Sequence, residues 1–250
     1  MREHDPAAEG RHAPASPSGA DATLVEHSGR VEDEVLTSCG SFQIRAADTE
    51  QGRSKARILV ERLYASRGYH TTLTAPFDLA NRMTLVATDA GRTIGTLSVR
   101  FDGDEGLAAD DLFRAEADAL RADGQRLCEF TKLAVDTSAR SREVLASLFH
   151  VAYLFAHRLG GYRALLIEVN PRHVGYYERM LGFRVLAGER PNRRVNAPAV
   201  LLGLDFRHAA AQISRLAGLR SFAAAERSLY PWFFSAPEEA GILRRLRDAV

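Results

Sequence analysis

A carboxylate and an imidazole are the first side chains to consider, because both exchange protons near neutral pH when their surroundings shift their pKa. Glu129 lies in the segment LCEFTKLAVD (Leu127–Asp136), where it is either a proton acceptor or an exposed strand carboxylate that pairs with Lys132. His173 lies in the first turn of a predicted helix that Asn170 caps, and the helix dipole there favours the neutral imidazole. A neutral imidazole suits a base or a hydrogen-bond donor, and the alternative is a polar helix-start residue with no chemistry.

Several common catalytic motifs are absent from the sequence. It contains no GxGxxG or GxxxxGK phosphate loop, no HExxH, no GxSxG and no His/Cys cluster at metal spacing. Nucleotide hydrolysis, zinc chemistry and a serine-hydrolase elbow are therefore not expected. Glu143, His150 and His157 lie on the polar side of a predicted helix, and we interpret them as a solvated face rather than a site.

The composition is that of an ordinary globular protein. Its 250 residues are 46% hydrophobic and 26% charged with a formal net charge of +1, which excludes a globally basic nucleic-acid binder. Two cysteines, Cys39 and Cys128, supply neither a disulfide framework nor a metal site of their own. No run approaches eighteen apolar residues and the N-terminus lacks a secretory signal, so a cytoplasmic protein without a membrane-spanning helix is expected.

Arginine dominates the basic residues, since only two of the 33 are lysines. The planar arginine fork grips carboxylates and phosphates, which suits an anionic partner. Codon bias in a GC-rich genome is the alternative explanation of the same skew.

Hydrophobic periodicity predicts helices and strands from Phe42 onward. We expect strands at 42–46, 84–88, 93–101, 127–135, 164–169, 183–187 and 199–206, and helices at 55–67, 110–123, 141–159 and 170–181. The near-continuous apolar run at 164–169 is typical of an interior strand covered on both faces. This order predicts an α/β fold with a mixed sheet, in which the central helix lies between two long strands.

Three regions follow from the same patterns. We expect a disordered acidic tail at 1–40, the α/β domain at 41–206, and a helical, Arg-rich extension at 207–250 that packs on the domain. The aromatic run Tyr230–Phe234 is expected to pack on the domain as well. The alternative is that it grips an apolar ligand or a membrane surface.

The segments Leu127–Asp136 and LLIEVNPRHVGYYERMLGFRVL (Leu165–Leu186) resemble the GNAT superfamily of acyltransferases. With RVNAPAVLL (Arg194–Leu202) they are similar to its N-acyl amino acid synthases, of the long-chain N-acyl tyrosine synthase type. The tyrosine-rich helix that ends in Leu-Gly-Phe is generic to the superfamily. Glu-Val-Asn-Pro-Arg-His followed by Arg-Val-Asn-Ala-Pro-Ala is specific to the subgroup. The resemblance covers roughly residues 42–206.

The resemblance implies a sheet in which two central strands splay apart and the pantetheine arm of an acyl thioester lies in the gap. Members of the subgroup take a long fatty acyl group from acyl carrier protein and place it on the α-amine of an amino acid, with no metal. A splayed strand leaves backbone N–H groups that can bond the pantetheine amides and polarise the thioester carbonyl. Here the candidates are the N–H groups around Leu133, Ala134 and Val135.

The same resemblance assigns two proton-transfer roles. Aminolysis of a thioester needs a neutral amine, and Glu129, near the expected opening, is the first candidate for the base that takes the proton. Tyr177 is the candidate general acid for the departing thiolate, because the superfamily often has a tyrosine on this helix. The commoner pattern places that tyrosine four residues before the glycine, whereas Tyr177 is five and Tyr176 six before Gly182, so either tyrosine could instead belong to the core.

The identity of the acyl donor is inferred from a difference between this sequence and the superfamily pattern. Acetyl-CoA users of the superfamily have a glycine-rich pyrophosphate loop at the start of the central helix, and the corresponding stretch 137–144 has no glycine. Backbone N–H groups near Ser141 can still bind a phosphate, and Arg140 and Arg142 add positive charge there. Asn170, which caps the next helix, is also counted among the donor-binding residues. An acyl-carrier-protein thioester, whose arm has one phosphate, is therefore favoured over CoA, and no permanently bound cofactor is expected.

The acceptor's carboxylate needs a cation in a partly dry pocket. Arg172, Arg193 and Arg194 are available, and Arg194 and Asn196 are preferred because they belong to the subgroup-like segment. Tyr176 is placed with these substrate-binding residues. A surface arginine is the alternative for any one of the three.

Two other functions remain open at this point. One is a different carrier-dependent acyltransferase, either similar to acyl-homoserine lactone synthases or associated with an envelope polymer. The other is a non-catalytic module that binds acyl carrier protein or an acyl ligand. Seven arginines against four acidic residues after Phe206 suit an acidic carrier protein as partner. No nucleic-acid partner is expected, and contact with a membrane surface is kept as an alternative.

Overall fold

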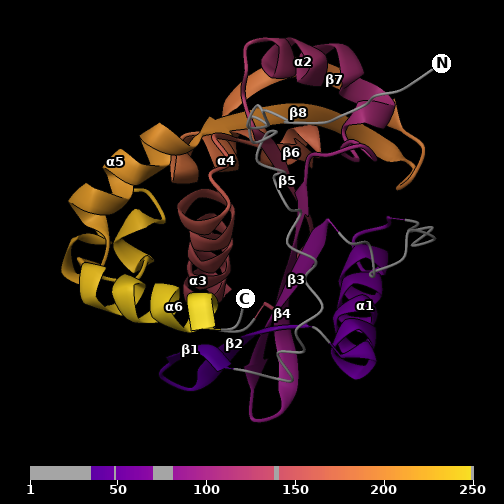
Figure 1. Ribbon diagram of the computed structural model, residues 1–250. Coiled ribbons are helices and arrows are strands. Elements are labelled where there is room, and N and C mark those ends of the chain that lie inside the picture. Colours follow the sequence, from indigo (N-terminus) through magenta and orange to yellow (C-terminus); the bar gives the residue numbers. More distant parts are fainter. Residues whose placement is uncertain (1–34, 48, 70–80, 138–140, 249–250) are drawn as a thin grey trace, which may run out of the picture.

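The computed structural model describes residues 35–47, 49–69, 81–137 and 141–248. Its centre is an eight-stranded sheet with the order β1-β2-β3-β4-β5-β6-β8-β7 (Figure 1). Neighbouring strands are antiparallel except β5 and β6, which are parallel. The predicted α/β fold with a mixed sheet is confirmed.

The strands and helices have the following bounds. The strands are β1 (Val35–Cys39), β2 (Phe42–Ala46), β3 (Arg82–Asp89), β4 (Arg92–Phe101), β5 (Leu127–Val135), β6 (Ala164–Val169), β7 (Arg184–Asn192) and β8 (Ala197–Asp205). The helices are α1 (Glu50–Ala65), α2 (Asp110–Ala122), α3 (Ser141–Tyr153), α4 (Val174–Leu181), α5 (Phe206–Leu216) and α6 (Ala236–Asp248). A π-helical segment (Leu154–Leu159) continues α3, and a 3-10 turn (Pro171–His173) precedes α4.

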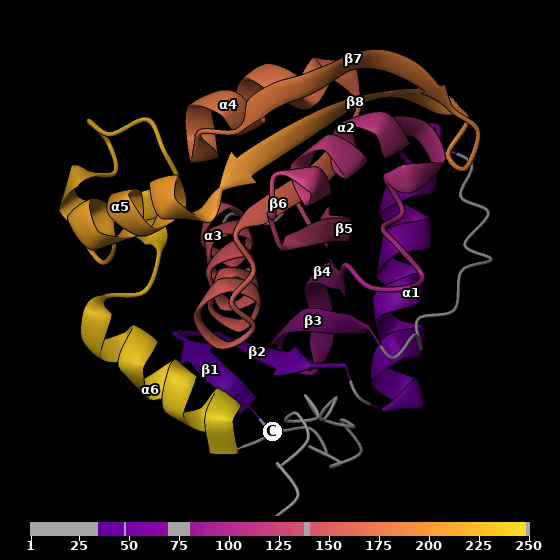
Figure 2. The same cartoon turned by 45° about the horizontal axis from the view of Figure 1, so that its top comes forward.

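Helices cover both faces of the sheet (Figures 1 and 2). α1 packs on β4 and β5 and α2 packs on β7, on one face, while α3 packs on β3, β4 and β5 from the other. Because side chains alternate along a strand, each strand supplies both layers. In β5, Cys128 and Phe130 join the main core with α3, whereas Leu127 joins a smaller cluster with Phe113 of α2.

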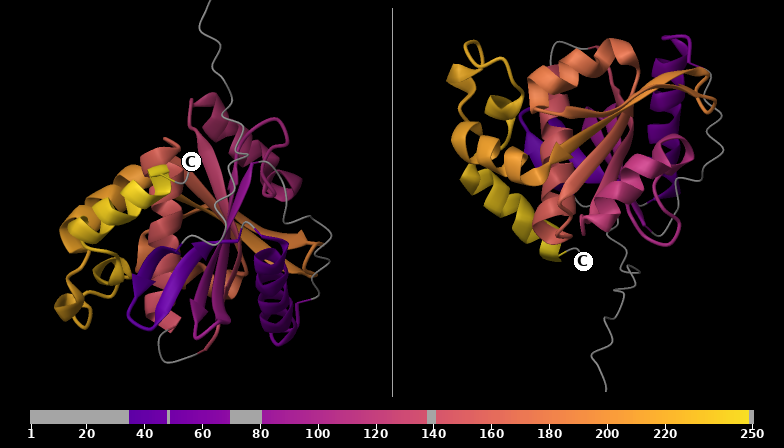
Figure 3. Two further views of the ribbon diagram at one scale, coloured as in Figure 1. Left: turned by 60° about the horizontal axis from the view of Figure 1, so that its bottom comes forward. Right: turned by 90° about the horizontal axis from the view of Figure 1, so that it is seen from above.

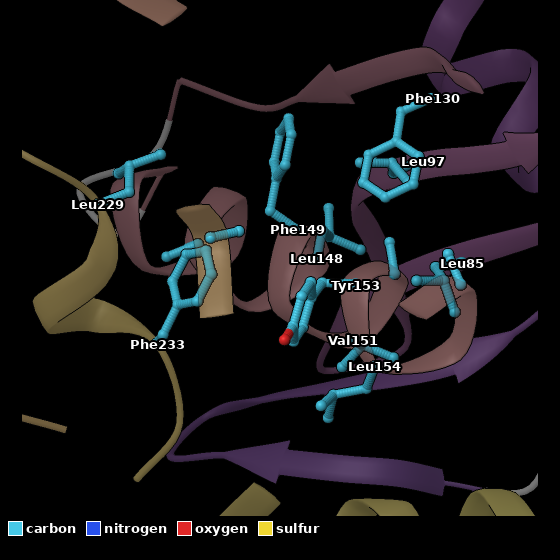
Figure 4. Close-up of a cluster of buried hydrophobic side chains, with 14 of the residues drawn as sticks. Leu85, Leu97, Phe130, Leu148, Phe149, Val151, Tyr153, Leu154, Leu229 and Phe233 are labelled. Carbon is cyan, nitrogen blue, oxygen red and sulfur yellow. The ribbon is translucent and has the colours of Figure 1, made fainter. Parts of the chain in front are cut away.

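The main core lies between the sheet, α3 and the C-terminal segment. Figure 4 shows Phe149 and Leu148 of α3 with Phe130 of β5 to one side and Leu229 and Phe233 to the other. Each fully buried side chain of this size stabilises the fold by about 1.5–3 kcal/mol. The C-terminal segment is therefore an integral layer of this core.

The predicted solvated face of the central helix is wrong for His150, which is fully buried. Its Nδ1 accepts a hydrogen bond from the backbone N–H of Phe234 at 3.0 Å, and the rings of Phe233 and Phe234 stack on it. Burial lowers the pKa of His150, which favours the neutral imidazole that can accept this bond. The C-terminal segment covers this side of α3, and the periodicity of the helix alone does not predict this contact.

The region after β8, which contains α5 and α6, packs against α3 and its π-helical continuation (Figure 3). The Tyr230 hydroxyl donates to the Leu181 carbonyl at 2.7 Å, and the Leu229 N–H donates to the Met180 carbonyl at 2.9 Å, so the aromatic run is tied to α4. Ile242 of α6 is fully buried in the main core. None of the described helices is long and apolar enough to cross a membrane.

Some predicted boundaries are wrong. The tail was expected to reach residue 40, but Val35–Cys39 form β1, which pairs with β2 and buries Leu36. α1 begins earlier than predicted because the Thr49 hydroxyl caps it by accepting from the Gly52 N–H at 3.0 Å. β7 is longer than predicted and continues to Asn192. Residues 1–34 lie outside the described part of the chain.

Candidate active site

The sheet opens between its two parallel strands. β5 and β6 pair from Leu127 opposite Ala164 to Glu129 opposite Leu166, although both strands continue beyond these residues. From there on β5 is paired with β4 alone. The expected splay of the two central strands is confirmed, and it begins at Glu129.

The stretch of β5 beyond the opening contains the predicted donor-binding backbone. Lys132 has a φ of +51°, and the register with β4 shifts beside it, which are the marks of a β-bulge. Leu133, Ala134 and Val135 follow, and β6 forms no ladder pairs with them. The Leu133 carbonyl accepts a hydrogen bond from the Tyr64 hydroxyl of α1 at 3.4 Å. The backbone here is therefore positioned by the bulge and by α1.

Glu129 is enclosed, with only 1% of its surface exposed. Its Oε2 accepts hydrogen bonds from the backbone N–H groups of Ala108 at 2.7 Å and Ala109 at 3.4 Å, both in the turn that leads into α2. Burial, followed by the charge of Glu168, raises its pKa to about 7 against the opposing effects of these hydrogen bonds and of Arg194. A carboxylate with this pKa can accept or release a proton at neutral pH.

A second carboxylate, Glu168 of β6, lies on the same face of the sheet and belongs to a polar network. Arg194 Nη2 donates to both of its oxygens at 2.6 and 2.7 Å, and Asn192 Nδ2 donates to Oε2 at 2.6 Å. Arg194 Nη1 also donates to the Ala108 carbonyl at 3.0 Å. Ala108 thus links the two carboxylates. Its N–H donates to Glu129, and its carbonyl accepts from Arg194, which in turn donates to Glu168.

The sequence reasoning missed Glu168 and Asn192. A signal was present, because Glu168 interrupts the apolar run of β6, and a charge in a strand covered on both faces needs a partner. The partners come from the β7–β8 hairpin. That contact is long-range, and the spacing of residues along the chain does not predict it.

The predicted carboxylate-binding residues are not brought together. Arg194 lies in the network around Glu168, whereas Asn196 is exposed at the tip of the hairpin with a φ of +49°. Arg172 is exposed on the turn before α4, where its Nη2 donates to the Tyr69 hydroxyl at 2.7 Å. Arg193 is exposed as well. Of the four, only Arg194 is close to the Glu129 cluster.

The turn before α4 positions Asn170 and His173. The Asn170 side chain accepts from the Arg172 N–H at 3.2 Å and so caps the turn. Arg172 Nε donates to His173 Nε2 at 3.2 Å, which requires an unprotonated nitrogen. Burial and then the charges of Arg172 and Arg67 lower the pKa of His173. The neutral imidazole expected from the sequence therefore has two local causes besides the helix dipole.

The two tyrosines of α4 differ in environment. Tyr177 packs against Phe149 and Phe183, and burial raises its pKa well above the usual range, with a further contribution from Tyr64. Tyr176 is half-buried, and burial also raises its pKa. Both phenols hold their proton at neutral pH. Tyr177 is the deeper of the two and lies within electrostatic range of Tyr64, which bonds the open strand.

The start of α3 contains part of the predicted phosphate-binding site. Ser141 is half-buried in the first turn and Arg142 is exposed beside it, while Arg140 lies outside the described residues. Glu143 of the same turn pairs with Arg220 of the C-terminal region at 2.9 Å. The local charge at this helix start is therefore partly set by a residue far along the chain.

A parallel strand pair that opens at a buried glutamate, beside a tyrosine-bearing helix, is the arrangement that the resemblance to GNAT acyltransferases implied. Over residues 55–205 the chain matches the family model described as N-acyl amino acid synthase FeeM. It belongs to this family, and the resemblance noted in the sequence is confirmed. The match to the family model ends at residue 205, so α5 and α6 lie outside the matched region. No curated protein matches the chain in sequence.

Several solved structures are similar to the chain. FeeM, an N-acyl amino acid synthase from uncultured soil microbes, is 27% identical with a TM-score of 0.61, and the match covers 68% of this chain and 93% of FeeM. An N-acetyltransferase from Staphylococcus aureus Mu50 is 14% identical with a TM-score of 0.48, covering 66% and 98% of the two chains. An acyl-CoA N-acyltransferase from Pseudomonas aeruginosa is 15% identical with a TM-score of 0.47, covering 65% and 97%.

Proposed function

We propose that this chain transfers a long-chain fatty acyl group from the thioester of acyl carrier protein to the α-amine of an amino acid. The observation that carries the proposal is Glu129, a buried carboxylate with a pKa of about 7 at the residue where the two central strands separate. A base of this pKa at the opening suits an amine that arrives as an ammonium ion.

The proposed reaction uses Glu129 and Tyr177 in turn. Glu129 takes one proton from the ammonium group, and the neutral amine attacks the thioester carbonyl carbon. Those backbone N–H groups of Leu133, Ala134 and Val135 that point away from β4 stabilise the oxyanion that forms. The C–S bond then breaks, the Tyr177 hydroxyl protonates the departing thiolate, and the second proton lost by nitrogen returns to the tyrosinate. Glu129 releases its proton to solvent, so each turnover yields one amide, one thiol and one proton.

The remaining predicted residues have supporting roles in this proposal. His173, neutral and close to Arg172, is a hydrogen-bond donor or a relay for the proton that Glu129 releases. The start of α3, with Ser141 and Arg142, binds the phosphate of the pantetheine arm. Asn170 caps the next turn and so positions His173.

The choice of carrier protein over CoA is supported by the start of α3, where no glycine allows close approach of a second phosphate. It is also supported by exposed arginines on α5 and α6, which suit an acidic partner. In the proposed domain organisation, the 41–206 domain performs the reaction and the 207–250 extension receives the carrier protein.

Mass spectrometry of lipid extracts tests the function. Cells expressing the chain are compared with cells expressing Glu129→Gln and with an empty-vector control. A ladder of N-acyl amino acids spaced by two CH₂ units, present only with the unmodified chain, supports the proposal and identifies both acceptor and acyl length. A folded, soluble protein that yields no such products contradicts it. Purified protein given acyl-carrier-protein and CoA thioesters of one chain length then decides the donor by the ratio of kcat/KM.

A further inference from the structure

A row of charged residues crosses three strands beside the opening. Arg82 of β3 lies opposite Arg100 of β4, and Arg100 lies opposite Glu129 of β5. Directly opposed residues on adjacent antiparallel strands have Cβ atoms about 5 Å apart and lie on the same face of the sheet. Their neighbours Val99 and Phe130 belong to the main core with α3, so the charged row faces the other layer, which contains α1 and α2.

Lys132 adds a third cation to this face. It occupies the bulge of β5, and burial followed by the charges of Arg82 and Arg57 lowers its pKa to about 8. The pKa of Arg82 is lowered by burial and then by Arg100, while Glu129 acts in the opposite direction. These mutual effects place Arg82 within electrostatic range of Arg100, Lys132 and Glu129.

Hydroxyl groups line the same face one row further along. The Thr84 and Ser98 hydroxyls are 2.8 Å apart, and Ser98 lies opposite Thr131. The Thr131 oxygen is buried and has no hydrogen-bond partner among the described residues. A polar atom buried without a hydrogen-bond partner lowers the stability of the fold unless a ligand or a water molecule bonds to it. The face therefore offers cationic and hydroxyl groups next to the proposed base.

Like charges directly opposite each other on adjacent strands are destabilising. Two half-buried guanidinium groups in that position, with a lysine beside them, are stabilised by an anion that binds between them. The one ligand of the proposed reaction that brings an anion next to its reacting nitrogen is an α-amino acid, whose carboxylate is two bonds from the amine.

We propose that Arg82, Arg100 and Lys132 bind the α-carboxylate of the acceptor amino acid while its amine lies against Glu129. This inference rests on the proposed function. Binding of the acceptor carboxylate is thereby assigned to residues of β3, β4 and β5. The sequence suggests Arg194 for this role, but in the structure Arg194 pairs with Glu168. The spacing fits, because a carboxylate over Arg100 is one strand away from Glu129.

Paired acceptors test this site. For each of three amino acids, kcat/KM is compared with that of the amine lacking only the carboxylate: tyrosine with tyramine, phenylalanine with phenethylamine, and leucine with 3-methylbutylamine. The unmodified chain is expected to prefer the amino acid. Arg100→Gln and Arg82→Gln are each expected to lower this preference roughly 10- to 100-fold, the range of a charge-assisted hydrogen bond, while kcat/KM for the amine changes little. Lys132→Gln is expected to act in the same direction.

Matched variants separate the site from a structural role. Arg100→Lys keeps the charge and is expected to retain part of the preference. Arg184→Gln, an exposed arginine on β7, is expected to change neither acceptor, and denaturant unfolding of every variant checks the fold. Equal losses for amino acid and amine, or an unchanged preference in Arg100→Gln and Arg82→Gln, overturn the inference.

Binding measurements keep the two proposals distinguishable. If the unmodified chain acylates none of the six acceptors, the proposed function fails on its own. Calorimetry with tyrosine and tyramine then still tests the site. Tighter binding of tyrosine that Arg100→Gln abolishes supports the carboxylate site, and equal binding of the two compounds overturns it.

Discussion

Glu129 and Glu168 lie on adjacent parallel strands and on the same face, Glu168 two residues beyond the partner of Glu129 and past the point where the strands separate. The two carboxylates are not equivalent. Arg194 and Asn192 donate to Glu168, whereas Glu129 accepts from the backbone N–H groups of Ala108 and Ala109. The charge of Glu168 raises the pKa of Glu129, so the paired carboxylate tunes the one that is proposed to act.

Replacement of Glu129 by glutamine is expected to lower kcat/KM for N-acylation by roughly 100-fold or more, because the amide cannot take the ammonium proton. The amide oxygen can still accept from Ala108 and Ala109, so the local fold is preserved. Initial rates at several pH values measure the effect. Glu178→Gln, an exposed glutamate on α4, is the control and should retain full activity. Activity of Glu129→Gln within a few-fold of the unmodified chain would remove Glu129 from the role of base.

The same substitution is expected to stabilise the protein at pH 8. The folded-state pKa of Glu129 is raised to about 7 from 4.5, so its contribution to stability is complete below about pH 4.5 and is lost as the pH rises through 7. Glutamine titrates in neither state and avoids that loss, which is on the order of 3 kcal/mol at pH 8. Urea unfolding of both proteins at pH 5 and pH 8 isolates the difference. A difference that is the same at both pH values would show that Glu129 has an ordinary pKa.

Changes at Glu168 and Arg194 are expected to shift the activity profile in opposite directions. Removing the charge of Glu168 lowers the pKa of Glu129, so Glu168→Gln should move the acidic limb of the kcat/KM profile to lower pH. Removing the guanidinium raises that pKa, so Arg194→Gln should move the limb to higher pH. Profiles from pH 5 to 9 give both shifts. Movement of the two limbs in the same direction would mean that another group governs the rate.

Tyr177→Phe is expected to lower kcat by roughly 10- to 100-fold with little change in donor binding, because the hydroxyl is proposed to protonate the thiolate only as the C–S bond breaks. Tyr162→Phe, a half-buried tyrosine just before β6 that contacts Arg126, is the control. Single-turnover rates and donor binding are measured separately. If Tyr177→Phe changes the free energy of unfolding but not the rate, Tyr177 is a core residue.

Local sequence patterns predicted most of the fold. β5 and β6 were predicted at their observed residues, because a strand rich in apolar and β-branched side chains is recognisable without its neighbours. The π-helical end of α3 and the full length of β7 were not predicted, since both depend on contacts with distant segments. The burial of His150 is the clearest example, because Phe234, which covers it, lies 84 residues further along the chain.

The candidate site was predictable only in part. Glu129 could be chosen because the resemblance placed it near an opening between strands. The partners of Glu168 could not, because Asn192 and Arg194 reach it from a hairpin whose register is set by β8. Arg82 and Arg100 look like ordinary strand arginines in the sequence, and only the alignment of three strands places them in one row with Glu129.

The C-terminal extension is proposed to dock the carrier protein. Deleting everything after β8 would remove Phe206 and Ile242 from the core and so expose apolar surface, which makes charge reversal the better test. Exposed arginines on α5 and α6 are suitable, namely Arg215, Arg244 and Arg247.

The triple variant, with these three arginines changed to glutamate, is expected to weaken binding of acyl carrier protein by roughly 10-fold or more at low salt and to flatten its salt dependence. Arg184→Glu on β7 is the control and should bind normally. Titration calorimetry between 50 and 300 mM salt measures both quantities, with unfolding curves to confirm that the variant is folded. Unchanged affinity and an unchanged salt slope would exclude α5 and α6 as the docking surface. A change of six charge units at the interface necessarily lowers the affinity for an acidic partner.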